Sequence, residues 1–390
     1  MLAALAAPSR DIAAAEDALA DAMERALQRW PVDGVPASPE GWLFTVARNR
    51  LRDMWKSSAH RMTEPLGAAT VVEAAAAGEE VPTLPDRRLE LMLVCAHPAI
   101  AENIRTPLML QTVLGVDAAA IGAAFAIEPA AMAQRLVRAK KRIRTAGIPF
   151  LLPQRDDLAA RLPAVLEAVY GAYAIDWQLT PQGPPIETLS AEALHLALVL
   201  ADLLPDEPEV LGLAALVCLS ESRRAARRSA DGVFVALDEQ DHQRWDAALI
   251  TRGEALLHRA HAFGRPGRFQ YEAAIQSAHC ARATTGRVDT EALQKLHKAV
   301  LRVAPSLGAA VASAAVDGEV DGPAAGLRAL DAITDAGIER FQPAWATRAH
   351  LLASADRPAE AVAAYRRAIA LTTDPGVVEY LSRRLRTVSC

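Results

Sequence analysis

Apolar residues recur at helical spacing in two segments near the start of the chain. In the first, from Ile12 to Leu27, they return every three or four positions, which predicts a helix that ends at Trp30-Pro31. A second helix is predicted to begin near Glu40, because its apolar residues again share one side. These residues are Trp42, Leu43, Val46, Ala47 and Leu51. The same stripe favours a core position for Trp42 over a base-stacking one.

The helical spacing then stops and resumes in a second module. Residues 57–85 show no sustained period and contain several prolines and glycines, which predicts a linker after a first module over 1–56. Residues 86–150 are helical again, and their last part is typical of a helix-turn-helix with its turn at Ile127 to Pro129. Gly122 lets the two helices approach closely. The inward side of the second helix is predicted to be Met132, Leu136, Ala139 and Ile143.

Residues 151–390 form a long series of alanine- and leucine-rich helical segments with an internal period. Small residues recur 33 and 36 residues apart near 286–380, which is typical of the second helices of tetratricopeptide units. The repeated positions are Ala292, Ala325 and Ala361, then Leu296, Ala329 and Tyr365, then Ala299, Ala332 and Ala368.

Composition supports an all-α protein and gives little sign of catalysis. Hydrophobic residues make up 52% of the chain but aromatic ones only 5%, which favours helices over strands. No apolar run approaches the roughly 20 residues that span a bilayer and no export signal is visible, so we expect a cytoplasmic protein without a membrane partner. The four cysteines lack CxxC spacing and no catalytic cluster is evident. We therefore expect no metal, no cofactor and no enzymatic activity.

Positive charge is concentrated locally although the net charge is −5. From Arg135 to Arg144 there are six cations and no acid, which favours contact with duplex DNA over a helix end that only complements its dipole. Because leading residues of a recognition helix meet base edges and flanking cations hold phosphates, we expect two groups of contacts. Base edges are assigned to Gln134, Arg135 and Arg138, and phosphates to Lys141 and Arg142.

The two N-terminal helices carry opposite charges. The first has an acidic face suited to a basic partner surface, although ordinary solvated surface gives the same pattern. That face consists of Glu16, Asp17, Asp21 and Glu24. On the second helix, cations can neutralise phosphates and Asn49 can pair with a base edge, although solubility alone is the alternative reading. The cations are Arg48, Arg50, Arg52 and Lys56.

Residues 1–150 resemble bacterial sigma factors of the extracytoplasmic-function type. The segment Ala15-Glu-Asp-Ala-Leu-Ala-Asp-Ala-Met-Glu-Arg-Ala-Leu resembles the helix that binds the clamp of core RNA polymerase. The segment from Trp42 to Asp53 resembles the helix that recognises and opens the −10 element, and Asn49 with Asp53 fits its N-x-x-x-D pattern. The helix after Pro129 resembles the reader of the −35 element. The resemblance implies a sigma-2 domain, a linker and a sigma-4 domain.

The extension is similar to one subgroup of that family, which carries a C-terminal tetratricopeptide-like domain. Three stretches carry this similarity, 203–213, 223–227 and 238–246. The resemblance implies a factor that directs core RNA polymerase to promoter DNA. Because stacked helix pairs offer concave binding surfaces and the extension is fused to the factor, we expect it to regulate this step in cis, with a protein or small-molecule ligand. An arginine cluster at 223–228 is expected to face an acidic surface such as 238–241.

A second function stays open at this point. Where the family usually has glutamine before the second acid of the first helix, this chain has Ala20, which lacks an amide for hydrogen bonding to polymerase. Only ten residues precede Asp11, so the first helix of the sigma-2 fold is expected to be short. The alternative is a helix-turn-helix regulator or a tetratricopeptide scaffold that does not direct polymerase.

Overall fold

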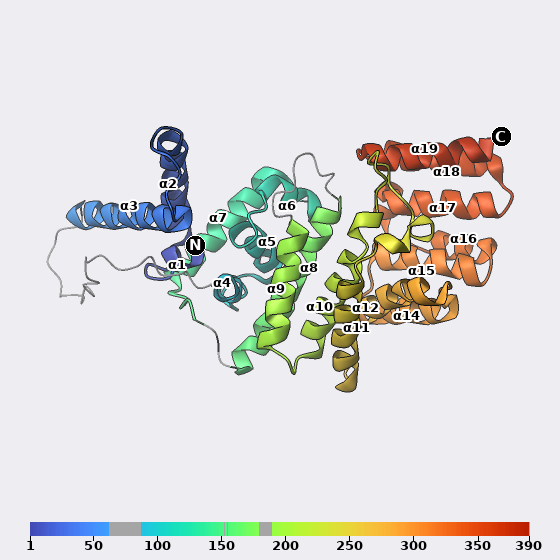
Figure 1. Ribbon diagram of the computed structural model, residues 1–390, viewed down its shortest axis with the longest axis horizontal. Helices are drawn as coiled ribbons and strands as arrows, with labels where there is room; N and C mark the ends of the chain where they lie inside the picture. Colours follow the sequence, from blue (N-terminus) through green and yellow to red (C-terminus); the bar gives the residue numbers. More distant parts are fainter. Residues whose placement is uncertain (62–86, 126, 152, 154, 179–188, 390) are drawn as a thin grey trace. The chain divides into compact units, whose positions relative to one another are not determined.

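A computed structural model describes residues 1–61, 87–125, 127–151, 153, 155–178 and 189–389 (Figure 1). Every named element in this part of the chain is a helix, and the one β-contact is an isolated bridge between Arg228 and Phe234. The all-α prediction is therefore confirmed. The chain divides into two compact units, Met1–Ile175 and Asp176–Cys390.

The first unit begins with three helices, α1 (Leu2–Ala6), α2 (Ile12–Asp33) and α3 (Pro39–Arg61). The Asp11 side chain caps α2 by accepting from Ala14 N at 3.2 Å. The prediction that α2 ends at Trp30-Pro31 is wrong, since the helix runs through Pro31 to Asp33. Proline is tolerated there because the carbonyl it leaves without a helical donor belongs to Leu27, which is 78% exposed and accessible to water.

The helix α3 is longer than the sequence pattern predicts. It continues to Arg61, so the first five residues of the predicted 57–85 linker are helical, and residues 62–86 lie outside the described part of the chain. Trp42 is half-buried and its ring meets that of Trp30 edge to face, with centroids 5.6 Å apart. This contact joins α2 to α3 and supports a structural role for Trp42.

Four helices form the second module, α4 (Arg88–Cys95), α5 (Glu102–Thr112), α6 (Ala118–Ala124) and α7 (Pro129–Thr145). Helices α6 and α7 make the helix-turn-helix, with Pro129 in the first turn of α7 and Glu128 as its N-cap. A Cβ on Gly122 would lie 2.7 Å from the Ile127 carbonyl oxygen, which explains the glycine. The four residues predicted for the inward side of α7 are all buried.

Helix α8 (Arg155–Gln178) belongs largely to the first unit, which ends at Ile175 rather than at the expected boundary of 150. Its buried Arg161 donates to the Leu93 carbonyl oxygen at 3.1 Å, and this ties α8 to α4. By length and composition alone, the span Asp157–Ile175 is apolar enough to cross a membrane. Half of that span is buried, as in the core helix of a folded domain.

The second unit begins with a helical cluster around α10 (Pro208–Glu221). Nearly every residue of α10 is buried, because α9 (Leu189–Leu203), α11 (Ala247–Ala262) and α12 (Arg268–Cys280) all pack against it. A long segment between α10 and α11 contains only short 3-10 turns. These are η1 (Arg224–Ala226), η2 (Leu237–Glu239) and η3 (His242–Arg244).

From α12 to the C-terminus, successive helices stack on one another (Figure 1). The short α13 (Arg282–Thr285) follows α12, and η4 (Ala336–Arg340) precedes α17. The longer helices that complete the stack are α14 (Thr290–Val303), α15 (Leu307–Val320), α16 (Pro323–Asp331), α17 (Gln342–Ser354), α18 (Pro358–Ala370) and α19 (Pro375–Ser389).

The predicted repeat positions agree with the structure at the last helix pair and differ at the middle one. Ala361, Tyr365 and Ala368 are all buried between α17, α18 and α19. In the middle pair, Ala332 is exposed because α16 ends at Asp331. The buried residues of α16 are instead Gly326, Leu327 and Leu330.

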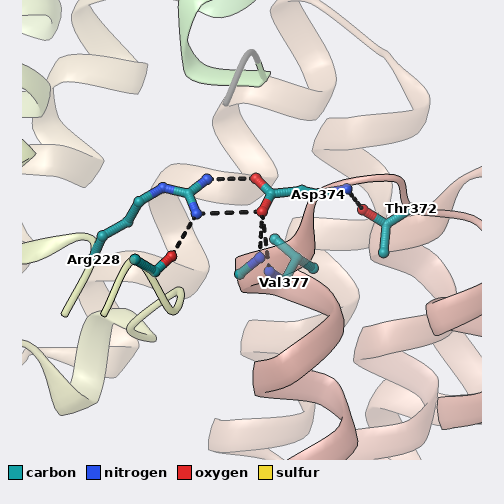
Figure 2. A network of polar contacts seen from close by, with 6 residues as sticks. Arg228, Thr372, Asp374 and Val377 are labelled. Atoms are coloured by element: carbon teal, nitrogen blue, oxygen red, sulfur yellow. Dashed lines mark hydrogen bonds and ion pairs between the residues drawn. The ribbon is translucent and has the colours of Figure 1, made fainter. Parts of the chain in front are cut away.

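An ion pair between Arg228 and Asp374 joins the segment after α10 to the start of α19 (Figure 2). The Arg228 guanidinium donates to both carboxylate oxygens of Asp374, and the Phe234 N–H donates to the Gly376 carbonyl oxygen at 3.2 Å. The arginine cluster, expected to face 238–241, has partners elsewhere. Arg223 pairs with Gln276, Arg224 with Glu221 and Ser190, and Arg227 with the Ser220 carbonyl oxygen.

Candidate nucleic-acid interface

The outward face of α7 carries the residues predicted to read DNA. Packing of the apolar stripe against α5 and α6 orients this face, because residues between the buried positions must point away from the core. No ion pair joins the cations of this face to a described acid. The exposed predicted residues are Gln134, Arg135, Arg138, Lys141 and Arg142.

Three of these cations border a hollow of about 360 Å³ between α7 and the start of α5. Arg135, Arg138 and Arg142 form one side, and the turn from Ala99 to Ile104 forms the other. Arg142 Nε points to the Ala99 carbonyl oxygen at 3.5 Å. The hollow therefore combines guanidinium groups with the N-terminal end of α5, and both favour an anion such as a phosphate.

Two of the six cations on α7 are used inside the first unit. Lys140 is 9% exposed, and its ammonium donates to both Glu16 carboxylate oxygens at 2.8 and 2.6 Å. Arg144 Nη1 donates to Asp11 Oδ2 at 2.8 Å, and Arg10 Nη1 donates to the Gly147 carbonyl oxygen at 2.9 Å. These contacts join α2 to α7, and they leave four cations of the run for an external partner.

The acidic face of α2 is divided between internal and external roles. Glu16 pairs with Lys140, and Asp21 Oδ2 accepts from Arg50 Nε of α3 at 2.6 Å. Asp17 and Glu24 are exposed, and Glu24 accepts only from Gln28 of its own helix, at 3.3 Å. Within this face, Asp17 and Glu24 are thus the acids most accessible to another protein.

The predicted −10 residues of α3 point to solvent where the structure describes them. Arg48, Asn49, Arg52 and Asp53 are exposed, whereas the side chain of Lys56 lies outside the described part. Ala47 and Leu51 are buried on the opposite side, which fixes the orientation of α3. The Arg48 guanidinium lies 5.8 Å from the centre of the Phe44 ring, close enough for a cation–π contact.

Sequence reasoning missed the internal partners of this surface. Lys140 was counted within the basic run, and its burial could have been read from its position next to Ala139 on the inward stripe. Asp11 and Arg144 gave no such signal, because their contact joins residues 133 positions apart.

The described residues of each unit, taken separately, offer no metal cluster and no reactive thiol. No group of three or more metal-ligating His, Cys, Asp or Glu side chains occurs in the described ranges. Burial raises the pKa of Cys95 to about 12 and that of Cys218 to about 11, so both thiols stay protonated at neutral pH. The charged faces of α2, α3 and α7 are suited to binding macromolecules.

Comparison with known proteins places this arrangement in a family. The chain is 33% identical over 383 residues to the uncharacterized protein R00370 of Rhizobium meliloti strain 1021, covering 96% of this chain and 90% of that protein. The chain belongs to the family of that protein. Residues 161–261 match a protein family of unknown function, DUF6596.

The N-terminal module has a more informative match. Residues 4–61, which contain α1, α2 and α3, match sigma-70 region 2. The chain is also 30% identical over 158 residues to the probable RNA polymerase sigma factor RfaY of Xanthomonas campestris, covering 39% of this chain and 38% of RfaY. No solved structure gives a significant match. The two sigma matches support a sigma-factor role for a member of this family.

Proposed function

We propose that this protein is a sigma factor of the extracytoplasmic-function type, which binds core RNA polymerase and directs it to promoters. The observation that carries the proposal is the match of α1, α2 and α3 to sigma-70 region 2, in a chain whose helix-turn-helix presents an exposed basic face. The polymerase performs the chemistry, so this chain needs no catalytic group and no cofactor. It then works in the cytoplasm, where promoter DNA and polymerase are.

The two DNA elements are assigned to separate helices. On α7, Gln134, Arg135 and Arg138 contact base edges of the −35 element, while Lys141 and Arg142 hold phosphates. Their exposure and the hollow beside α5 support this assignment. On α3, the residues assigned to the −10 element are Arg48, Asn49, Arg52, Asp53 and Lys56.

Polymerase binding is assigned to the acidic face of α2. Asp17 and Glu24 are exposed and available, whereas Glu16 and Asp21 must first leave their partners Lys140 and Arg50. The stacked helices from α12 to α19 resemble tetratricopeptide units, and we assign them a regulatory role in cis. Their ligand is then a protein or a small molecule.

A pull-down with purified core RNA polymerase tests the first step. The full chain should retain polymerase, and the double variant Asp17→Asn, Glu24→Gln should retain several-fold less. The matched control is Asp202→Asn, which removes an exposed acid of α9 in the other unit. If wild type and double variant retain polymerase equally, the acidic face of α2 is not the binding surface.

The second candidate function is a DNA-binding regulator that does not direct polymerase. The pairing of Glu16 and Asp21 within the first unit favours it, because half of the predicted acidic face is occupied. This candidate predicts promoter-region binding through α7 and no retention of core polymerase. The pull-down therefore separates the two functions.

A further inference from the structure

A cavity of about 300 Å³ lies within the second unit. One wall is the segment between α10 and α11, through Leu237, Asp238 and Trp245. The opposite wall comes from stacked helices of the C-terminal part, α12, α14, α15, α17 and α19. A volume of this size is at the lower end for small-molecule sites, so it suits a ligand about as large as one metabolite.

Two arginines of the cavity come from different helices. Arg282 of α13 donates to the backbone carbonyl oxygen of Asp238 at 2.7 Å, which leaves its guanidinium with further donors. Arg384 of α19 lies 3.6 Å from a carboxylate oxygen of Glu239. Both side chains are partly buried, so an anion between them would be held more strongly than on an open surface.

Two carboxylates face the same cavity without partners. The side chains of Asp238 and Glu319 accept no hydrogen bond from any described residue and form no ion pair with one. They lie near enough for the charge of Asp238 to act on Glu319. Two neighbouring carboxylates that lack a cation are suited to an ammonium group.

The two histidines of the cavity carry little charge, and the aromatic residues give it an apolar surface. Burial, with the charge of Arg223, lowers the pKa of His279 to about 4, and burial with Arg384 lowers that of His350. Both histidines are therefore mainly uncharged at pH 7, and the charged groups that line the cavity are two arginines and two carboxylates, with Glu239 beside Arg384. Trp245 is 7% exposed and its indole N–H has no hydrogen-bond partner in the described part of the molecule. A buried donor without a partner is unusual in a folded protein and indicates that a ligand or water completes it.

We propose that this cavity binds a free amino acid. The ammonium group lies between Asp238 and Glu319, the carboxylate binds Arg282 and Arg384, and the side chain packs against Trp245 and Tyr380. A simple anion would leave both carboxylates without a cation. A simple amine would leave the guanidinium of Arg282 without an anion, whereas Arg384 already lies beside Glu239. A zwitterion matches both pairs at once.

Thermal unfolding of the full chain with each of the twenty L-amino acids in turn tests the proposal. At least one should raise the unfolding midpoint, because a ligand that binds only the folded state stabilises it. Calorimetry with that amino acid should then show one site per chain. The amine formed by decarboxylation lacks the carboxylate, and the acid formed by deamination lacks the ammonium group. Each should bind at least about tenfold more weakly than the amino acid, since each loses one set of charged hydrogen bonds.

Two variants place the site in the cavity. Asp238→Asn and Glu319→Gln should each weaken binding by about tenfold, because the carboxylates are exposed and the substitutions keep the shape. Asp202→Asn, an exposed acid of α9, should bind like wild type. The proposal fails if no amino acid shifts the midpoint, or if both cavity variants keep wild-type affinity. Neither polymerase nor DNA takes part, so the result is independent of the sigma-factor proposal.

Discussion

Lys140 of α7 donates two hydrogen bonds to Glu16 of α2, of 2.8 and 2.6 Å. The lysine side chain is 10% exposed and the glutamate 31%, so the pair is partly shielded from water. An ammonium group in such a place needs a partner, because its desolvation is costly. The pair therefore fixes how α7 sits against α2 of the sigma-70 region 2 module.

Replacing Glu16 should destabilise the first unit. Glu16→Gln leaves the buried Lys140 ammonium without its carboxylate, which is expected to cost about 1 to 3 kcal/mol. Urea unfolding followed by circular dichroism measures the change. Asp17→Asn is the matched control, since Asp17 is exposed and its substitution should stay within about 0.5 kcal/mol. Equal stabilities for both variants would show that the pair contributes nothing.

Substitutions on the outer face of α7 should separate base reading from phosphate binding. Arg138→Ala is expected to cost about 1 to 3 kcal/mol of binding to promoter DNA and to relax sequence preference, because it removes a base contact. Lys141→Ala should weaken binding to all sequences and reduce the salt slope by about one. Fluorescence anisotropy at several salt concentrations measures both effects.

The control for these α7 variants is Arg287→Ala, which removes an exposed cation of the second unit. Its DNA affinity should match that of wild type. If Arg138→Ala also matches wild type, Arg138 does not contact the −35 element. A loss of the same size on every sequence would reassign it to the phosphates.

The Arg228–Asp374 pair should stabilise the second unit. Asp374 also caps α19 by accepting from Gly376 N at 2.8 Å and Val377 N at 3.2 Å (Figure 2). Asp374→Ala removes the cap and the ion pair together, with an expected cost of about 2 to 3 kcal/mol. Thr373→Ala, at the exposed neighbouring position, should have little effect. A cost below about 0.5 kcal/mol for Asp374→Ala would contradict this role.

The effect of Asp374 should depend on pH. Burial alone would raise the pKa of this carboxyl, but hydrogen bonds from Arg228 and from the backbone of Val377 and Gly376 outweigh burial and lower it. The folded state thus releases the proton more readily than the unfolded one. Its contribution is complete above about pH 4, the ordinary value, and is lost as the pH falls through the lowered value. The gap between wild type and Asp374→Ala should therefore close in acid.

His279 should make the second unit sensitive to mild acid. Burial, together with Arg223, His297 and Arg282, lowers its pKa from 6.5 to about 4. Between these values the unfolded state binds a proton that the folded state does not, so stability falls as the pH falls. At pH 5 the loss is about 2 kcal/mol relative to pH 7.

Urea unfolding of wild type and His279→Gln at pH 7 and pH 5 measures this loss. The variant should lose less stability on acidification, because it lacks the group that titrates. His258→Gln, which removes an exposed histidine of α11, should keep the wild-type dependence. An identical pH response in all three proteins would show that His279 is not the source.

The sequence pattern predicted much of the helical structure, because helix formation depends on residues that are close in sequence. The buried stripe of α7 and the turn before Pro129 follow from helical spacing and from residues that begin helices. The end of α2 could not be predicted in this way. Whether the helix tolerates Pro31 depends on the exposure of Leu27, whose carbonyl loses its helical donor, and packing decides that exposure. The wrong assignment of Ala332 has a similar cause, since α16 is shorter than the repeat implies.

The candidate site was predicted as residue types rather than as contacts. The exposure of Arg135 and Arg138 could be predicted, because neither residue lies on the apolar stripe of α7 that packs against the core. Lys140 had the same charge as its neighbours, and only folding brings Glu16, 124 residues away, to meet it. The cavity beside Trp245 was beyond pattern reasoning, because segments spread over more than a hundred positions form its walls.

In vitro transcription tests the central claim most directly. Purified core RNA polymerase is incubated with a template that carries the region upstream of this gene, with and without the full chain. We expect a discrete start site that appears only with the protein and weakens with Arg138→Ala but not with Arg287→Ala. A chain that binds this DNA through α7 and yields no start site with core polymerase would contradict the sigma-factor proposal.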